Sequence, residues 1–359
     1  MIALLAESLD PARGGAERAI RATARALARR TEVVLYAPAD RLGPVEPGIE
    51  TVGVSLGARS RAARARELAR ALSDEARRRG GTLVACGKIL GADLLWSHGG
   101  VHAAAREASA TTSRLPVPVA RALRRLRPVE RAFDAIEREN AEAARVGRLR
   151  LVALSERVGR DLSERFGLVP AAVVRNGVEL DRFRPREEHE GREVRALFCA
   201  HAFALKGLDR AIRALAFAPS ARLTVVGRGA HGPWLALAHA RGVADRVTFK
   251  GEVADLAPEL AASDVLLHPT RYDPCSLVVL EALAAAVPVI TTREDGSSEV
   301  VREGGFVLED SDSPEEAGTR LEALADPDTR ARLSRAARSS ARSIESCAGE
   351  LLQVSSRSP

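Results

Sequence analysis

Short apolar runs alternate with longer amphipathic stretches along the whole chain. The apolar runs predict strands near residues 2–6, 32–36, 82–86, 93–97 and 149–154, and again near 196–200, 223–227, 247–250, 265–268, 287–292 and 306–308. The amphipathic stretches predict helices near 15–29, 61–79, 103–113, 117–144 and 155–166, then a helix after most later strands and a final one near 335–352. This alternation is typical of parallel sheets with helices on both faces.

A polar segment near residues 178–192, which contains Pro185 and many charged residues, interrupts the alternation. We expect this segment to link two domains, and the length of 359 residues agrees with that number. The expected fold class is therefore α/β, with two doubly wound, Rossmann-like parallel-sheet domains facing a cleft. The predicted domain bounds are 1–178 and 179–340, followed by a C-terminal segment at 341–359. Ligands of such sheets bind beyond the carboxyl ends of the strands, so functional residues are expected in the loops that follow strands.

The composition narrows the class of protein. A hydrophobic content of 46% and a charged content of 28% exclude disordered, collagen-like and coiled-coil chains. The four cysteines form no C-x-x-C pair, which predicts neither a disulfide scaffold nor a thiolate metal site. A signal peptide is not expected, because residues 1–6 lack a cationic leader and are followed at once by Glu7. A membrane-spanning segment is not expected either, because the best apolar stretch, 277–290, is interrupted by Glu281 and Pro288. A cytoplasmic location is the expectation.

Two loops carry features that suit an anionic ligand. Gly14 and Gly15 stand between the first strand and a helix, where glycine exposes backbone N–H groups to a phosphate; a tight turn that needs glycine is the alternative. Lys206, one of only three lysines, follows a strand and precedes a helix, where a cation can neutralise a diphosphate. The alternative for Lys206 is an ordinary solvated surface lysine.

The segment 268–283 carries the strongest pattern. A strand ends at His268, a short loop contains Asp273, and Pro274 and Ser276 suit the start of a helix. Glu281 falls inside that helix among apolar neighbours, which predicts a buried carboxylate that needs hydrogen-bond partners. Sugar or ribose hydroxyls would supply such partners, and the helix amides would hold phosphate. A core glutamate satisfied by the protein itself is the alternative.

These motifs together resemble a known enzyme family. The pattern Asp273-x7-Glu281, the pair Lys206-Gly207, the Gly14-Gly15 loop, the run Arg175-Asn176-Gly177-Val178 and the run Val225-Val226-Gly227-Arg228-Gly229 are similar to those of retaining glycosyltransferases of the GT-B fold, family 4. Within the family, the chain is most similar to bacterial lipopolysaccharide-core and cell-envelope enzymes. The resemblance covers essentially the whole chain and is more specific in its C-terminal half.

The resemblance implies a reaction, its substrates and the residues that bind them. A sugar would move from a nucleotide-sugar donor to a glycan or glycolipid acceptor of the bacterial cell envelope, without a metal ion. Lys206 would stabilise the leaving diphosphate, Asp273 would contact the donor sugar, and Glu281 would bind the ribose hydroxyls. The acceptor would bind the first domain and the nucleotide the second, and the final helix would pack back toward the first domain.

The resemblance assigns the remaining contacts mainly to backbone. They comprise the amides of Ser276, Leu277 and Val278 for the sugar and diphosphate, Gly15 for the approach of the phosphate, Val253 beside the nucleobase, and His102 beside the transferred sugar. In the family, retention is usually explained by attack of the acceptor hydroxyl on the same face as the leaving phosphate, so no protein nucleophile is required.

The chain also departs from the family pattern. Ala204 stands where an arginine of an Arg/Lys clamp is common, and Asp273 is one methylene shorter than the usual glutamate. Arg175 and Arg293 are candidates to replace the missing guanidinium. These departures motivate an alternative, in which the protein binds a sugar nucleotide or a glycan without catalysis.

Two arginine-rich segments, 59–79 and 114–127, suit a phosphorylated glycolipid acceptor or peripheral association with an anionic inner membrane, and a solvated helix surface is the alternative. Nucleic acid is not an expected partner, because aromatic residues make up only 3% of the chain. No metal site is expected. His98 and His102 are separated by two glycines rather than by helix, and Asp310-Ser311-Asp312 precedes a helix start at Ser313-Pro314.

Overall fold

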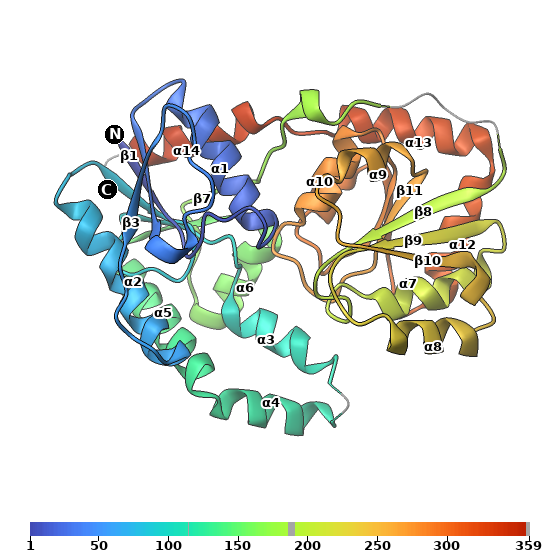
Figure 1. Ribbon diagram of the computed structural model, residues 1–359, viewed down its shortest axis with the longest axis horizontal. Coiled ribbons are helices and arrows are strands. Elements are labelled where there is room, and N and C mark those ends of the chain that lie inside the picture. Colours follow the sequence, from blue (N-terminus) through green and yellow to red (C-terminus); the bar gives the residue numbers. More distant parts are fainter. Residues whose placement is uncertain (114, 186–190, 357–359) are drawn as a thin grey trace. The chain divides into compact units, whose positions relative to one another are not determined.

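The computed structural model describes residues 1–113, 115–185 and 191–356, which form two compact units (Figure 1). Unit 1 comprises Met1–Gly177 and the C-terminal segment from Ser343, and unit 2 comprises Val178–Arg342. The chain therefore leaves unit 1, completes unit 2 and returns to unit 1.

Within the described residues, unit 1 contains a seven-stranded parallel sheet in the order β3-β2-β1-β4-β5-β6-β7. The strands are β1 (Ile2–Leu5), β2 (Val33–Pro38), β3 (Glu50–Val54), β4 (Thr82–Ala85), β5 (Leu94–Trp96), β6 (Arg150–Ala153) and β7 (Ala172–Val173). The helices are α1 (Gly15–Ala28), α2 (Arg61–Arg77), α3 (His102–Ala110), α4 (Val117–Leu126), α5 (Pro128–Arg145), α6 (Glu156–Phe166) and α14 (Ile344–Ser356), with a short 3-10 helix η1 (Ala39–Arg41). The central strands β1, β2 and β4 are almost wholly buried apolar sequence, as parallel strands covered on both faces require.

Unit 2 contains, in the part of the chain described, a six-stranded parallel sheet in the order β10-β9-β8-β11-β12-β13. The strands are β8 (Val194–Cys199), β9 (Ala221–Val226), β10 (Val247–Gly251), β11 (Val265–His268), β12 (Val289–Thr292) and β13 (Gly305–Leu308). The helices are α7 (Leu208–Ala214), α8 (Gly232–Ala240), α9 (Ala257–Ala261), α10 (Leu277–Ala284), α11 (Ser298–Val301), α12 (Pro314–Glu322) and α13 (Pro327–Ser339). Short 3-10 helices lie at η2 (Leu180–Arg182), η3 (Leu215–Phe217), η4 (Ala244–Arg246) and η5 (Ala323–Ala325).

The expected α/β class with two parallel sheets is confirmed, but three details of the expectation are wrong. The sequence pattern missed β3 and β7, which are edge strands; β3 is only partly buried and has no continuous apolar run. The helix expected at 117–144 is two helices, because Pro128 forces Arg127 into an extended conformation (φ −67°, ψ 129°). The helix expected at 335–352 is also two helices, α13 and α14, separated at residues 340–343.

The C-terminal helix α14 packs against α1 in unit 1 (Figure 1). Glu345 forms an exposed ion pair with Arg29 at 3.1 Å, and the Sγ atom of buried Cys347 lies 3.9 Å from Oγ1 of Thr23. Leu351 of α14 is fully buried. The last helix therefore completes the core of the unit that the chain builds first.

One glycine fixes how two loops of unit 2 meet. Gly207, which precedes α7, has φ +83°, and a Cβ atom at this position would lie 2.0 Å from the carbonyl oxygen of Pro269. Any side chain would therefore both strain the backbone and push the loop after β8 away from the loop after β11.

We predict that Gly207→Ala lowers the free energy of unfolding by more than about 1 kcal/mol, because alanine is strained at this φ and meets the carbonyl group. Thermal unfolding followed by circular dichroism would measure the loss. Gly232→Ala is a matched control, since a Cβ at Gly232 meets nothing within 4 Å, and its stability should stay near that of the wild type. Equal stability of the two variants would contradict this prediction.

Candidate functional site

Three loops meet at the carboxyl ends of the strands in the unit 2 sheet. The strands β8, β11 and β12 are neighbours and parallel, so their carboxyl ends lie together. The loops that follow them are residues 200–207, 269–276 and 293–297. The backbone N–H of Arg271 donates to the carbonyl of Leu205 (2.9 Å), and the N–H of Asp273 donates to the carbonyl of Glu294 (3.0 Å). These bonds link the second loop to both of its neighbours.

An ion pair stands at the centre of this arrangement. Nζ of Lys206 lies 2.6 Å from Oδ2 of Asp273 and also donates to the carbonyl oxygen of Tyr272 at 3.0 Å. The Lys206 side chain is only 20% exposed and that of Asp273 only 13%. The structure thus brings together two residues that the sequence analysis singled out 67 positions apart.

Two further side chains belong to this arrangement: His268 contacts Asp273, and Asp295 lies in the loop whose backbone pairs with that of Asp273. Nε2 of buried His268 lies 3.7 Å from Oδ2 of Asp273 and 3.3 Å from Oγ of Ser276. Asp295, in the third loop, is 0% exposed; its Oδ1 accepts the amides of Ser297 (2.8 Å) and Ser276 (3.4 Å). Sequence reasoning did not assign a role to His268 or Asp295, because only the contact between their loops shows that they belong to the site.

The two carboxyl groups differ in their pKa values. Burial alone would raise the pKa of Asp273, but the Lys206 ammonium and the contacts with His268 outweigh it and hold that pKa well below its usual range. Burial first, and then the negative charge of Asp273, raise the pKa of Asp295 to about 6. Asp273 is therefore ionised at neutral pH, whereas Asp295 titrates close to neutrality.

The helix α10 begins at Leu277, with Ser276 as the residue that precedes it. The amides of Leu277 and Val278 lie in its first turn, where N–H groups have no partner within the helix. Glu281 lies about one turn further along and is 4% exposed, so its predicted burial is confirmed. An anion at the start of α10 would face these amides beside Lys206.

Two guanidinium groups support the loop after β11. Arg271 forms a two-point ion pair with Asp209 (2.8 and 2.8 Å) and donates to the carbonyl of Ala204 at 2.8 Å. Arg210 donates to the carbonyls of the loop at residues 269 and 270 and pairs with Asp312 at 2.6 Å. An arginine does lie beside Ala204, but its charge is balanced by Asp209.

The arginines that the sequence analysis considered as replacements make other contacts. Arg293 pairs with Glu309 at the surface, and Arg175 lies in unit 1, 3.3 Å from Glu156. Val253 is partly buried and follows β10, so it also lies at the carboxyl ends of the strands. In the sheet, β10 is two strands away from β8. The place of Val253 agrees with a contact to one end of a long ligand that also reaches the loop after β8.

Unit 1 holds the other predicted site residues. Gly15 is the first residue of α1, after Gly14, whose backbone is extended (φ 166°). His102 is the first residue of α3, and its Nε2 lies 2.9 Å from Oε2 of Glu130. Burial first, and then the charge of Lys88, lower the pKa of His102, while Glu130 opposes this shift. His102 is therefore neutral at pH 7.

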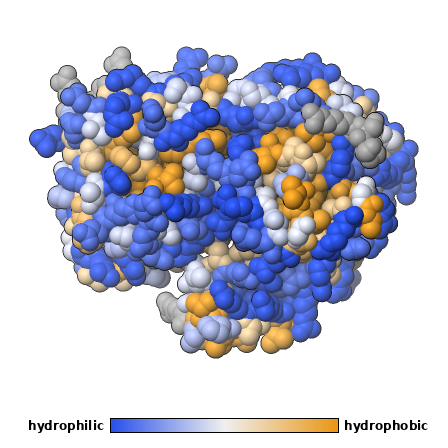
Figure 2. Space-filling view, turned by 180° about the vertical axis from the view of Figure 1, so that it is seen from behind, coloured by the Kyte–Doolittle hydropathy of each residue, from blue (hydrophilic) through white to orange (hydrophobic). Residues whose placement is uncertain are grey.

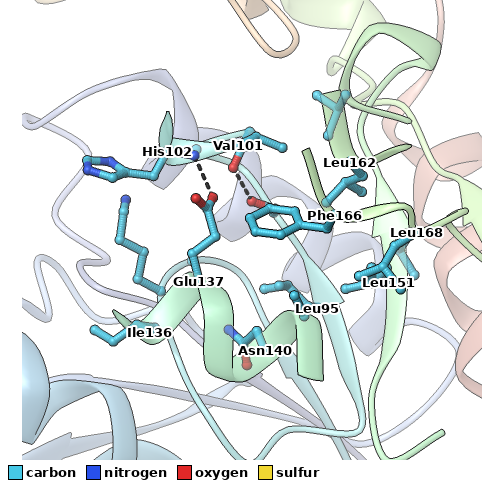
Figure 3. A pocket seen from close by; sticks show the side chains of 18 residues that line it. Leu95, Val101, His102, Ile136, Glu137, Asn140, Leu151, Leu162, Phe166 and Leu168 are labelled. Carbon is cyan, nitrogen blue, oxygen red and sulfur yellow. Dashed lines mark hydrogen bonds between the residues drawn. The ribbon is translucent and has the colours of Figure 1, made fainter. Parts of the chain in front are cut away.

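Two unit 1 residues that sequence reasoning left unassigned lie beside His102. The carboxylate of Glu137 accepts the backbone amide of His102 at 2.6 Å (Figure 3), and burial raises the pKa of Glu137. Lys88, from the loop after β4, lines the same cavity as His102 and Glu137. Its backbone amide donates a hydrogen bond of 2.8 Å to the side chain of Glu7, which lies in the loop after β1. The scarcity of lysine in the chain was the one signal that could have singled out Lys88.

A cavity of about 50 Å³ lies next to His102 and Glu137 (Figure 3). Lys88, His102 and Glu137 contribute polar groups to its lining, and Leu95 and Phe166 are among its apolar residues. The enclosed part of this volume is enough for a few water molecules.

Comparisons with known proteins agree with this geometry. Residues 13–182 match the family model described as Glycosyltransferase Family 4, and residues 194–326 match one described as Glycosyl transferases group 1. The chain is 30% identical over 269 residues to the D-inositol 3-phosphate glycosyltransferase of Streptomyces scabiei, which covers 64% of this chain and 60% of that protein. It is 36% identical over 121 residues to the lipopolysaccharide glucosyltransferase WaaG of Escherichia coli, covering 32% of each chain.

Solved structures share the fold over the full length. The crystal structure of WaaG superimposes with a TM-score of 0.79 at 23% identity and covers 100% of both chains. The Anabaena protein HepE, in complex with UDP and glucose, gives a TM-score of 0.71 at 16% identity over 99% of both chains.

The chain belongs to glycosyltransferase family 4, a family of retaining hexosyltransferases with the GT-B fold. The curated relatives named above differ in acceptor, and the matched segments span 60% and 32% of their lengths. Within the described residues, the longest apolar helices fall short of what crossing a bilayer requires.

We predict that Asp295→Asn changes how stability depends on pH. Between the unfolded pKa of about 3.9 and the folded value of about 6, the folded protein binds more protons at Asp295 than the unfolded chain does. The contribution of Asp295 to stability therefore falls as pH rises through this range and is constant above it. Asparagine does not ionise and so does not lose stability in this range. At pH 8 the free energy of unfolding of the variant should therefore exceed that of the wild type by up to about 3 kcal/mol.

Urea unfolding of both proteins at pH 4.5 and pH 8 measures the difference. The advantage of Asp295→Asn should shrink markedly at pH 4.5. A stability difference that is the same at both pH values would show that Asp295 does not titrate in this range.

Proposed function

We propose that the protein is a retaining glycosyltransferase that moves a sugar from a nucleotide-sugar donor to a glycan or glycolipid acceptor of the bacterial cell envelope. The observation that carries this proposal is the contact of Lys206 with Asp273 at the start of α10, whose first amides precede the buried Glu281. A cation, free helix amides and a buried carboxylate are the groups that a sugar, a diphosphate and a ribose need.

Each group of unit 2 then has a defined part in the reaction. The bond between the anomeric carbon and the diphosphate oxygen breaks, and Lys206 and the amides of Leu277 and Val278 stabilise the negative charge that develops. The Ser276 amide, which the family resemblance also assigns to the donor, already donates to Asp295 at 3.4 Å. Asp273 holds Lys206 in place and contacts the sugar. Glu281 binds the ribose hydroxyls, and Val253 borders the base.

The acceptor hydroxyl attacks the anomeric carbon on the face that the diphosphate leaves, and its proton passes to a diphosphate oxygen. The configuration of the sugar is thereby retained without a protein nucleophile. In this proposal unit 1 binds the acceptor, with His102 beside the transferred sugar and Gly15 beside the phosphate. The charge of the diphosphate is met by Lys206 and the amides, without a metal ion.

The structure of HepE in complex with UDP and glucose supports a nucleotide-sugar donor for this fold. UDP-glucose is therefore the first donor to test, followed by GDP- and ADP-sugars. A ligand that binds the folded chain raises its melting temperature, so a thermal-shift screen identifies the donor class. Binding of a donor with no turnover for any acceptor would favour the alternative, a non-catalytic binding protein.

We also propose that the protein associates peripherally with the cytoplasmic face of the inner membrane. The exposed residues of α4 support this part of the proposal. Val119, Leu123 and Leu126 are 46–60% exposed, and Figure 2 shows hydrophobic side chains on the projecting segment that carries α4. Exposed Arg121 and Arg125 interleave with them. Exposed apolar residues and arginines on one short helix match the acyl chains and the negative headgroups of an anionic bilayer.

We expect Lys206→Ala to reduce kcat/KM for the selected donor by about 100- to 1000-fold, because it removes the cation that faces the developing charge. Initial rates of transfer or donor hydrolysis measure this loss. Arg222→Ala also removes one positive charge, but from an exposed ion pair with Glu193, and should retain activity. Similar rates for both variants would exclude Lys206 from the reaction.

Glu281→Gln should weaken donor binding by about tenfold or more, because a neutral amide accepts hydrogen bonds from ribose hydroxyls less strongly than a carboxylate. Isothermal titration with the selected sugar nucleotide measures the affinity. The same change should leave the affinity for the free sugar unaltered, and an unaltered affinity for the sugar nucleotide would contradict the assigned role.

Leu123→Glu is expected to reduce binding to vesicles that contain phosphatidylglycerol by about tenfold, since it places a negative charge among the exposed apolar residues of α4. Vesicle cosedimentation measures the binding. Val169→Glu is the matched control, because Val169 is 82% exposed but lies outside α4. Equal effects of the two changes would show that α4 is not the membrane contact.

A further inference from the structure

Asp295 is a fully buried carboxyl group to which the proposed reaction gives no part. It lies in the loop after β12, and its two oxygens contact three separate residues. Oδ1 accepts the amide of Ser297 (2.8 Å) and, across the loop, the amide of Ser276 (3.4 Å). Oδ2 lies 3.0 Å from Oγ1 of Thr291. Asp295 thus links the end of β12 to Ser276, the residue that precedes α10.

The contacts of Thr291 indicate where a proton resides. Oγ1 of Thr291 lies 3.0 Å from the carbonyl oxygen of His268 as well as 3.0 Å from Oδ2 of Asp295. A hydroxyl group has one hydrogen, and a carbonyl oxygen only accepts. When the Thr291 hydroxyl donates to His268, the contact with Asp295 requires a hydrogen on Oδ2. A protonated Asp295 therefore satisfies both contacts, whereas an ionised Asp295 leaves one of them without a hydrogen.

The groups that face Asp295 from the neighbouring loops favour the same state. Asp273, whose backbone pairs with the Asp295 loop, places a negative charge nearby, while His268 and Lys206 favour the ionised form less strongly. Burial is the largest influence, and together these effects raise the pKa of Asp295 to about 6. Geometry and electrostatics agree that the neutral form is readily accessible.

We propose that Asp295 is a positioning residue of the donor site: in its neutral form it holds the start of α10 against the Lys206–Asp273 pair, where the diphosphate of the donor binds. This inference rests on the proposed function. Loss of the proton adds a negative charge beside the ion pair and leaves Thr291 with one hydrogen for two acceptors, the carbonyl of His268 and Asp295. Donor affinity should therefore decrease as pH rises through about 6.

The test is the pH dependence of sugar-nucleotide binding. Esterified diphosphates have no second phosphate ionisation near pH 6, so UDP-glucose, GDP-mannose and ADP-glucose are suitable probes. With the probe that binds, the wild type should lose about three- to tenfold in affinity between pH 5.5 and pH 7.5. Asp295→Asn keeps the acceptor oxygen and donates to Thr291, so its affinity should match that of the wild type at pH 5.5 and stay constant.

Two further variants distinguish the effect of the Asp295 proton on donor affinity from the effect of packing around Asp295. Thr291→Val removes the acceptor for the Asp295 proton, so the midpoint of the pH profile should move to lower pH. Ser297→Ala removes the hydroxyl that donates to the carbonyl of Ser276 (3.0 Å) but keeps the amide, so it should change affinity without moving the midpoint.

Each outcome has a defined meaning. A pH profile in Asp295→Asn that equals the wild-type profile would overturn the inference and assign the titration to another group, such as His268. An upward shift of the midpoint in Thr291→Val would overturn it as well, because Thr291 would then donate to ionised Asp295. Failure of all three probes to bind the wild type would instead contradict the proposed function.

Discussion

A largely buried carboxylate beside one of only three lysines is the constraint on which the loops after β8 and β11 depend. Asp273 is kept ionised by Lys206, and the ammonium group in turn binds the carbonyl of Tyr272. The loops after β8 and β11 must therefore approach closely, and Gly207 permits it because no side chain fits against Pro269. The same approach places the cation at the start of α10, so a single interaction shapes both the local backbone and the charge of the site.

The regular part of the fold could be predicted from the sequence, because buried parallel strands are continuous apolar runs. The strands β8, β9, β11 and β12 lie where those runs are found. The strands β3 and β7 could not be found in this way, because β3 is only partly buried and has no continuous apolar run, and β7 has only two residues. The breaks at Pro128 and at residues 340–343 show that helical periodicity continues across a point where the backbone changes direction.

The candidate site could be predicted only where a residue type is unusual for its position. Lys206 was visible as a rare lysine between a strand and a helix, and Glu281 as a charge among apolar residues. Asp295, His268 and Arg271 were not visible, because their importance arises from contacts between loops that lie far apart in the sequence. Pairings of this kind depend on the order of strands in the sheet, which the hydrophobic pattern does not encode.

The return of the chain to unit 1 has a consequence for biosynthesis. Ribosomal synthesis produces most of unit 1 first, then all of unit 2, and only then α14, which covers α1. Until the last residues emerge, the apolar face of α1 that α14 buries stays open to solvent or to chaperones. The second unit is continuous in sequence and can close its own core earlier, so the half of the molecule that is translated first is the last to be finished.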